Sequence, residues 1–395
     1  MSVKPTTIRR CLFLVFAGAF LSISVSSVYA DDVIGPGKAT SRDGSPMLWY
    51  DLQLLDVEGQ GWTETKSIYD RLPKKAEKLV RSPVWSLSRH SAGLCARFFA
   101  DATEIHASWT LTSKSLAMPH MPATGVSGLD LYVKTNNGKW RWLAVGRPTA
   151  QTNTVRLVGG IPPGRREFML YLPLYNGVSS VEIGLPKGAK LSKAGSRGHG
   201  REKPVIFYGT SITQGGCASR TGMVHTAILG RRLNLPVINL GFSGNGRMEL
   251  EVAKLMAELD AAVYVIDCLP NITASQVAER TEPLVRALRK ARPETPILLV
   301  EDRSYTDSFL ITSKRKRNLD SRKALTKVYE TLTSAGVRNL HYLAGEHLLG
   351  DDGEGTVDSS HPTDLGFVRQ ADAFEKVLRP ILKSSGHAQK SEANQ

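Results

Sequence analysis

The second half of the chain alternates continuously apolar segments with amphipathic ones, and this alternation constrains the fold more than any other feature. The apolar segments span residues 205–208, 236–240, 262–268, 297–300 and 340–343. Helical periodicity follows them at residues 222–233, 249–259, 275–291, 317–334 and 364–383. Strands without polar alternation are buried on both faces. Residues 204–384 are therefore predicted to form a three-layer α/β domain around a parallel sheet.

The region before residue 192 has a different pattern, in which apolar and polar residues alternate as in half-buried strands. Such short runs span residues 105–111, 129–133, 140–145, 154–158, 167–173 and 178–185. Turns rich in glycine and proline separate them, and Asn136-Asn137-Gly138 is typical of a hairpin. Many short strands joined in this way predict an all-β sandwich of the jelly-roll type over residues 31–191.

Two further segments resemble neither domain. Residues 192–203 are small, basic and rich in glycine, which predicts a linker between the two domains. Residues 385–395 are polar and are predicted to form a disordered tail.

Residues 1–30 have the pattern of a secretory signal peptide. Lys4, Arg9 and Arg10 form a basic start, an apolar run follows from residue 11 to about residue 25, and Val28-Tyr29-Ala30 suits cleavage after Ala30. The alternative is a membrane anchor, but the run is short for a bilayer span and is diluted by serines. We therefore expect export to the periplasm or the exterior, without stable membrane insertion.

The basic charge of the chain is concentrated in its first half. Lysine and arginine number 51 against 37 acidic residues, a formal net charge of +14. Residues 31–200 hold 22 basic and 14 acidic residues, whereas residues 201–395 hold 26 and 23. Export argues against nucleic acid as the partner. A basic β domain on an exported protein instead predicts an acidic or sulfated polysaccharide, bound in a salt-dependent way.

Three cysteines remain after the predicted cleavage, namely Cys95, Cys217 and Cys268. An odd number in an exported protein leaves at least one free thiol. Cys217 and Cys268 lie close in sequence to the motifs described below and could form a disulfide. The alternative of two buried thiols is favoured, because a free cysteine behaves as a small core residue.

Other sets of residues suggest sites but have a simpler interpretation. The run from Lys314 to Arg317 is interpreted as a solvated loop or helix start rather than a lip for anionic substrate. All six tryptophans lie in the predicted β domain. We interpret most of them as core residues rather than as a stacking platform for sugar rings. Most histidines lack the spacing of metal ligands, so we expect no metal and no cofactor. We interpret the following as structural or surface residues: His90, His106, His120, His199, His225, His341, His347 and His387.

Polar residues and glycines follow the predicted strands at their carboxyl ends, where sites form in open α/β sheets. Ser211 follows the first strand, and a serine there can expose its hydroxyl at the start of a helix. Gly241 and Gly244 follow the second strand, where a glycine N–H can approach a ligand closely. Asn271 follows the third strand, where its amide can donate to a developing oxyanion. Each of these features alone also fits an ordinary cap or turn.

The last motif, Asp358-Ser359-Ser360-His361, precedes the final predicted helix. Its spacing allows the carboxylate to fix the tautomer of the imidazole and to stabilise the imidazole cation. The alternative is an aspartate that caps the helix beside a surface histidine. Asp364 is a competing cap, which weakens that alternative.

Taken together, these four blocks resemble those of the SGNH, or GDSL-type, hydrolase family. In this chain Gly209-Thr210-Ser211-Ile212-Thr213 stands where the family commonly has G-D-S, so the serine is kept and an acidic neighbour is lost. Gly128-Leu129-Asp130-Leu131-Tyr132 matches the G-x-D-L-Y string of a bacterial subgroup with a leading β domain. The resemblance implies an SGNH-type, flavodoxin-like domain preceded by that β domain.

The resemblance also assigns roles to residues. Ser211 would be the nucleophile, His361 the general base and later the acid, and Asp358 the residue that orients His361. The oxyanion donors would be the N–H of Ser211, the N–H of Gly244 and the side chain of Asn271, with Gly241 as the other candidate glycine.

The function implied is that of an exported serine esterase that removes short acyl groups, above all acetyl, from a polysaccharide or oligosaccharide. Two alternatives stay open at this point. One is a lipase-like or thioesterase activity on longer acyl chains. The other is a non-catalytic polysaccharide-binding protein with a retained hydrolase fold.

Overall fold

A computed structural model describes residues 1–2 and 32–387. Apart from Met1 and Ser2, the predicted signal peptide lies outside the described residues, and so does the predicted tail beyond His387. In the part of the chain that is described, none of the helices combines the length and the apolar character that a membrane span needs.

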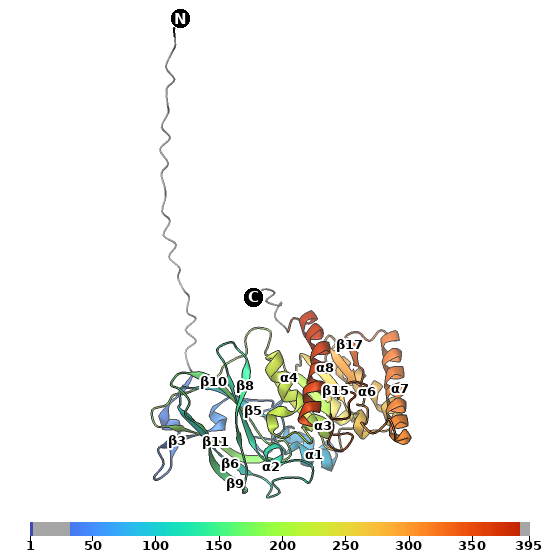
Figure 1. Ribbon diagram of the computed structural model, residues 1–395. Helices are drawn as coiled ribbons and strands as arrows, with labels where there is room; N and C mark the ends of the chain where they lie inside the picture. Colours follow the sequence, from blue (N-terminus) through green and yellow to red (C-terminus); the bar gives the residue numbers. More distant parts are fainter. Residues whose placement is uncertain (3–31, 388–395) are drawn as a thin grey trace. The chain divides into compact units, whose positions relative to one another are not determined.

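The second part of the chain contains one five-stranded parallel sheet (Figure 1). Its strands are β13 (Val205–Gly209), β14 (Val237–Gly241), β15 (Val263–Asp267), β16 (Ile297–Val300) and β17 (Leu340–Leu343). Their order in the sheet is β14-β13-β15-β16-β17, which is the flavodoxin-like order with its switch point between β13 and β15. Every residue of β13, β15 and β16 is buried, which explains why these strands are continuously apolar.

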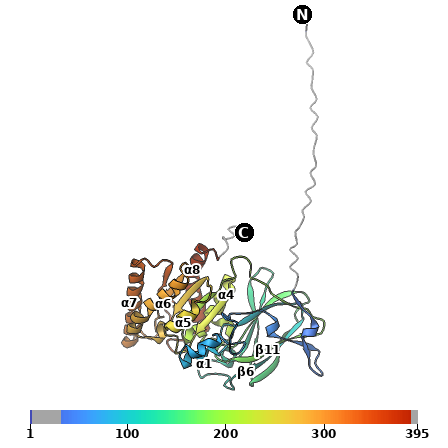
Figure 2. The same cartoon turned by 180° about the vertical axis from the view of Figure 1, so that it is seen from behind.

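Helices cover both faces of this sheet (Figures 1 and 2). One face packs against α4 (His225–Leu233) and α8 (Asp364–Ser384), and the other against α5 (Leu250–Met256), α6 (Ala274–Ala291) and α7 (Thr312–Ser334). Neighbouring residues of β13 serve opposite faces: Phe207 packs against Phe374 of α8, whereas Tyr208 shares a core with Val252 of α5. The predicted three-layer α/β fold is confirmed.

The first part of the chain is a sandwich of two antiparallel sheets, as predicted. One sheet contains β1 (Val33–Ile34), β12 (Leu191–Lys193), β5 (Cys95–Ala100), β10 (Arg166–Tyr171), β7 (Leu129–Lys134) and β8 (Trp140–Gly146), with β4 (Val57–Glu58) beside β5. The other contains β2 (Thr40–Ser41), β3 (Met47–Asp51), β11 (Val178–Pro186), β6 (Glu104–Leu111) and β9 (Thr152–Gly159). Side chains such as Trp109, Phe98 and Phe168 fill the space between the sheets.

The structure differs from the predicted linker at 192–203 in its first half. Leu191–Lys193 forms β12, which pairs with β1 and β5. The guanidinium of Arg197 is buried and forms an ion pair with Glu58. Small and basic residues suggested a free connection, but the pairing partners are far away in the sequence. Local composition therefore did not indicate them.

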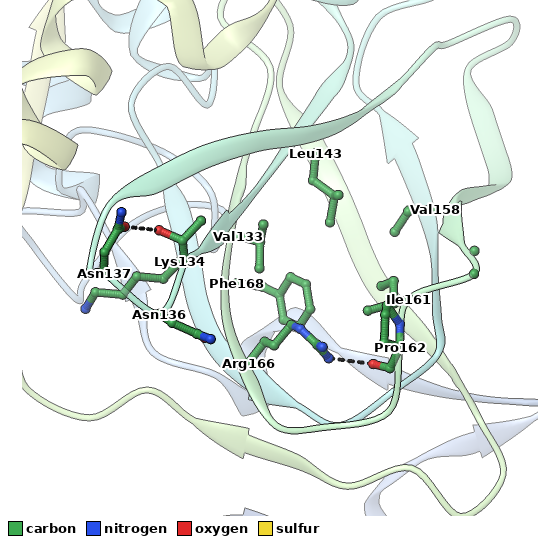
Figure 3. A pocket seen from close by; sticks show the side chains of 13 residues that line it. Val133, Lys134, Asn136, Asn137, Leu143, Val158, Ile161, Pro162, Arg166 and Phe168 are labelled. Atoms are coloured by element: carbon green, nitrogen blue, oxygen red, sulfur yellow. Dashed lines mark hydrogen bonds between the residues drawn. The ribbon is translucent and has the colours of Figure 1, made fainter.

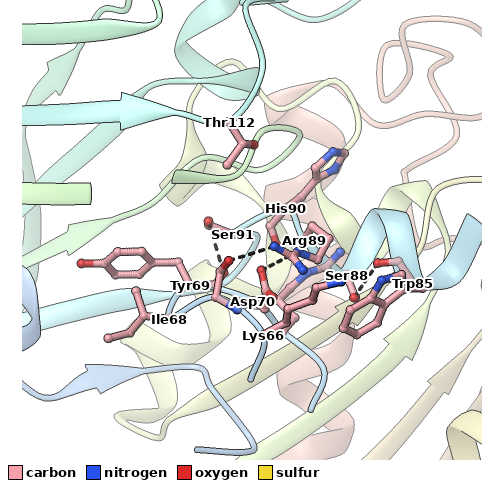
Figure 4. A network of polar contacts seen from close by, with 12 residues as sticks. Lys66, Ile68, Tyr69, Asp70, Trp85, Ser88, Arg89, His90, Ser91 and Thr112 are labelled. Carbon is pink, nitrogen blue, oxygen red and sulfur yellow. Dashed lines mark hydrogen bonds and ion pairs between the residues drawn. The ribbon is translucent and has the colours of Figure 1, made fainter. Parts of the chain in front are cut away.

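A second difference is the excursion between β4 and β5, residues 59–94, which contains the helix α1 (Ser82–Ser88) rather than strands. Polar contacts hold its shape (Figure 4). Asp70 pairs with Arg89 at 2.9 Å, and the hydroxyl of Ser91 donates to the carbonyl of Tyr69 at 3.4 Å. Its apolar residues Leu72, Ala76, Val80 and Val84 belong to the same core as β13 and β14, so this excursion completes the α/β part.

Arg71, in this excursion, is a buried cation without a carboxylate partner among the described residues; it is 1% exposed. Its guanidinium donates to the carbonyls of Asn239 at 3.0 Å and Gly241 at 2.7 Å, in β14. It also donates to the carbonyls of His90 at 2.9 Å and Leu87 at 2.6 Å. One side chain thus joins the excursion to the end of β14, the edge strand of the parallel sheet.

The G-x-D-L-Y string forms a second junction between the two parts. Asp130, fully buried, accepts hydrogen bonds from Arg220 at 2.7 Å and from the N–H of Gly222 at 2.8 Å. Tyr132 accepts from Arg220 at 2.5 Å. A side chain at Gly128 would meet the carbonyl of Thr124 at 2.4 Å, which explains the glycine.

We predict that Arg71→Met lowers the free energy of unfolding by about 3 kcal/mol or more, because two buried and two partly buried carbonyls lose their donor. The measurement is urea unfolding of the full chain followed by tryptophan fluorescence. Arg286→Met is the matched control, since Arg286 pairs with Glu282 on the exposed face of α6 and such pairs contribute less than about 1 kcal/mol. Equal unfolding midpoints for the two variants would contradict the prediction.

Candidate active site

Ser211 lies at the carboxyl end of β13, in the single helical turn α3 (Ser211–Gln214). The hydroxyl of Thr210 caps this turn by accepting from the N–H of Ile212 at 3.3 Å. Ser211 is 9% exposed, and its own carbonyl accepts a hydrogen bond from the hydroxyl of Tyr175 at 3.1 Å. The serine is therefore held in one position with its side chain at the surface of the turn.

The structure brings Ser211, His361 and Asp358 together in one hydrogen-bonded chain. The Ser211 Oγ lies 2.7 Å from His361 Nε2, and His361 Nδ1 lies 2.7 Å from Asp358 Oδ2. The other carboxylate oxygen accepts from the backbone N–H groups of His361 at 2.7 Å and Ser360 at 3.1 Å. Backbone N–H groups of its own loop thus hold the carboxylate in the position from which it orients the imidazole.

The electrostatics of this loop keep Asp358 ionised. Partial burial acts to raise the pKa of Asp358, but hydrogen bonds from the backbone and ring of His361 act in the opposite direction and prevail. The pKa of Asp358 therefore lies below its ordinary value. A carboxylate that stays charged through the mildly acidic range can stabilise an imidazolium cation there.

The two candidate glycines of the second block differ in what their backbone does. The N–H of Gly241 already donates to the side chain of Asn239 at 2.9 Å, and its carbonyl accepts from Arg71. Gly244 sits in an exposed turn with φ of +66°, a conformation that favours glycine. The geometry therefore favours Gly244 over Gly241 as a donor to a ligand.

Asn271, after β15, lies against the turn that contains Gly244. With its amide oriented to suit its neighbours, Oδ1 accepts from the N–H groups of Asn245 at 3.1 Å and Gly246 at 3.3 Å. That orientation leaves the Nδ2 hydrogens for another acceptor. The turn also adjoins α3, because the N–H of Ser243 donates to the side chain of Gln214 at 3.0 Å.

Sequence reasoning missed several residues that surround the site. Gln214 donates from Nε2 to the carbonyl of Leu174 at 3.0 Å and lies 3.1 Å from His90 Nδ1. His90, Leu174 and Tyr175 come from the first part of the chain, whereas Gln214 belongs to α3. The ring of His120 lies 5.9 Å from that of His361. His90 and His120 thus lie beside Gln214 and His361, and no local pattern distinguishes them from the other histidines.

A buried ion pair lies beneath α3. Asp267, at the end of β15, accepts two hydrogen bonds from Arg303 at 2.9 and 2.6 Å, and both side chains are almost fully buried. Asp267 also accepts from the hydroxyl of Thr213 at 3.1 Å. Because Thr213 belongs to α3, this pair links the turn that carries Ser211 to the core of the α/β part.

The cysteines of residues 32–387 form no disulfide. Cys95, Cys217 and Cys268 are all free and buried, so the two-thiol interpretation is confirmed and the pairing alternative is wrong. Burial, and after it the charge of Asp358, raises the pKa of the Cys217 thiol to about 12. That thiol therefore stays protonated near the site at neutral pH. Within residues 32–387, no group of three potential ligands is placed to hold a metal ion.

A separate cavity of about 710 Å³ lies in the β sandwich (Figure 3). The side chains of Leu143, Val158 and Phe168 point into it, and Arg166 stands at its margin. None of the residues that line it belongs to the four blocks around Ser211. No tryptophan lines it either, and Phe168 is its one aromatic lining residue.

Comparisons with known proteins agree with this geometry. Residues 202–379 match the model of the GDSL-like lipase/acylhydrolase family. Residues 47–191 match the GxDLY model, which describes the N-terminus of SGNH-hydrolase-type esterases. Among curated proteins no match was found.

Three solved structures illustrate the likeness. A protein from Bacteroides ovatus described as a GDSL-like lipase is 34% identical, with a TM-score of 0.81 over 85% of this chain and 98% of that one. A salicylyl-acyltransferase from a tetracycline biosynthetic pathway is 19% identical, with a TM-score of 0.64 over 89% and 98%. A family two carbohydrate esterase from Clostridium thermocellum, in complex with cellohexaose, is 17% identical, with a TM-score of 0.54 over 74% and 93%.

The fold and these matches define a GDSL-type hydrolase. The chain belongs to the SGNH (GDSL-type) hydrolase family, in the group in which the hydrolase domain follows a GxDLY β domain.

The histidine beside Gln214 makes stability depend on pH. Burial, and after it the charge of Arg71, lowers the pKa of His90 to about 4. An unfolded chain binds a proton at its ordinary pKa of about 6.5. Between these values the unfolded state binds a proton that the folded state does not, so stability falls as the pH falls.

We predict that His90→Gln removes about 2 kcal/mol of the stability loss between pH 7 and pH 5, because glutamine has no proton to take up and still offers an acceptor. Urea unfolding of both proteins at the two pH values measures this difference. The same loss in both proteins would show that His90 is not the cause.

Proposed function

We propose that this protein is a serine esterase that uses Ser211, His361 and Asp358 as a catalytic triad. The observation that carries the proposal is the continuous chain of 2.7 Å contacts from Ser211 Oγ through His361 to Asp358. A serine hydroxyl is a weak nucleophile until a neighbouring base removes its proton, and this arrangement supplies that base.

The reaction proceeds in two steps, acylation of Ser211 and hydrolysis of the acyl-serine. Ser211 Oγ attacks the ester carbonyl carbon while its proton passes to His361 Nε2, and Asp358 stabilises the imidazolium. The bond to the leaving alcohol breaks, and His361 returns the proton to the alcohol oxygen. Water then attacks the acyl-serine, again giving its proton to His361. Collapse of the second intermediate releases the carboxylic acid and returns the proton to Ser211.

The negative charge that develops on the carbonyl oxygen needs donors already in place. We assign these to the N–H of Ser211, the N–H of Gly244 and the side chain of Asn271. Two observations support this assignment. Gly244 lies in an exposed turn with a positive φ, and the side chain of Asn271 contacts that same turn. Each such donor typically contributes about 3 kcal/mol to stabilising the transition state.

We assign the substrate class as short acyl esters, above all acetyl esters, on a polysaccharide or oligosaccharide. The fold shared with carbohydrate esterases, one of them with cellohexaose bound, supports this assignment. The basic balance of residues 31–200 supports an acidic or sulfated polymer. The signal-like pattern of residues 1–30 supports export, which would bring the enzyme to such polymers.

We predict that Ser211→Ala lowers kcat for an aryl acetate by about a thousandfold or more, because the nucleophile is lost. Hydrolysis is followed by the absorbance of the released phenol. Ser360→Ala is the matched control, since Ser360 contributes its backbone N–H rather than its hydroxyl to Asp358. Retained activity in the Ser211 variant would exclude Ser211 as the nucleophile, whereas no activity in the unaltered protein would favour the non-catalytic binding protein.

A second prediction concerns acyl length. Along a series of aryl esters, kcat/KM should be highest for acetate and fall steeply with longer chains, and acetate should be released from acetylated polysaccharide. A maximum at long acyl chains would instead favour the lipase-like or thioesterase alternative. The Ser211→Ala protein is the blank for both measurements.

A further inference from the structure

The most exposed apolar residues of the molecule gather in one short segment beside the site. Apart from Met1, Phe309 at 81% and Leu310 at 71% are the most exposed large apolar side chains among the described residues. Ile311 follows at 40%, and Leu319 on the next helix is 57% exposed. Three consecutive exposed apolar residues are unfavourable in water, so a contact that covers them is the expected reason for their presence.

This apolar tip, residues 309–311, is held in a defined turn. The N–H groups of Leu310 and Ile311 donate to the carbonyl of Asp307 at 3.1 and 2.9 Å. The side chain of Lys314 bonds both Asp307 and, at 2.8 Å, the hydroxyl of Ser359. The tip therefore projects from a fixed base and does not fold back onto the protein.

Basic residues follow the tip directly on α7. Positions 312, 315, 316, 319 and 323 share one face of a helix by their spacing, and Arg315, Lys316, Leu319 and Lys323 are all exposed. Lys316 is 73% exposed and pairs only with Asp320 at the surface, a contact that salt and competing anions readily replace. Figure 1 shows α7 at the end of the molecule away from the β sandwich, and the tip directly precedes this helix in the chain.

We propose that the apolar tip and the basic face of α7 dock the enzyme on an anionic lipid surface. Phenylalanine and aliphatic side chains enter the boundary between headgroups and acyl chains, and adjacent lysines and arginines are attracted to anionic headgroups. A polysaccharide suits the basic face but not Leu310 and Ile311, which offer neither hydrogen bonds nor an aromatic platform. The combination of both features on one surface selects the membrane as partner.

The docking surface is bonded directly to the catalytic loop. The N–H of Thr306 donates to the carbonyl of Ser359 at 3.1 Å, and Ser359 stands between Asp358 and His361. A docked molecule would hold its triad next to the lipid surface and act on esters displayed there. The docking itself does not rest on the proposed esterase activity, because it uses residues outside the triad.

The test is co-sedimentation of the full chain with vesicles made of equal parts of phosphatidylcholine and phosphatidylglycerol. Phe309→Ser with Leu310→Ser should weaken binding by about tenfold or more, equivalent to about 1.4 kcal/mol. Arg315→Gln with Lys316→Gln should weaken binding to these vesicles by a similar factor and make it independent of salt. Hydrolysis of a soluble aryl acetate by both variants should equal that of the unaltered protein, which shows that they are folded.

Lys114→Gln with Lys139→Gln removes the same charge from the exposed surface of the β sandwich and is the control. It should bind vesicles like the unaltered protein; equal weakening would mean that net charge alone causes binding. Absence of vesicle binding, with binding to soluble dextran sulfate that Arg315→Gln with Lys316→Gln abolishes, would assign the surface to a polymer instead. A dimer in solution that Phe309→Ser dissociates would assign it to a second copy of the chain.

Discussion

The buried guanidinium of Arg71 is the constraint on which the arrangement of the site depends. Arg71 belongs to the excursion between β4 and β5, and its guanidinium donates to two carbonyls of β14, those of Asn239 and Gly241. A buried cation must have its donors satisfied, so the end of β14 and the excursion take up one mutual position. The turn with Gly244 starts directly after this fixed strand end.

The arrangement of Ser211, His361 and Asp358 is consequently supported by both parts of the chain. Tyr175 holds the carbonyl of Ser211, and Leu174 and His90 hold Gln214, whose side-chain oxygen accepts from Ser243 in the turn that contains Gly244. Residues of the first part of the chain therefore hold the residues around Ser211 in position, and this role does not depend on whether the β sandwich binds a ligand. The buried pair of Asp267 and Arg303 supports the turn α3, which carries Ser211, through the hydrogen bond from Thr213 to Asp267.

The features that could be predicted from the sequence are those with a local signal. Continuous apolar runs indicated the five parallel strands, and spacing alone brought Asp358 and His361 together. Arg71 and Gln214 give no such signal. Their hydrogen-bond partners lie far away in the chain, so their structural roles become visible only in the folded protein. The same reason explains β12. Its sequence is typical of a linker, and it forms a strand because it pairs with β5, which lies far away in the chain. Gly244 was preferred to Gly241 by analogy, and the structure adds a physical reason, the bond to Asn239.

The position of the G-x-D-L-Y string has a consequence for how such chains diverge. Asp130 and Tyr132 direct their polar atoms at Arg220, beyond the boundary between the two family models. The string by which one domain is recognised is therefore half of an interdomain contact. Exchange of either domain between relatives would preserve function only when the aspartate and the arginine are inherited together, so the two positions are expected to co-vary.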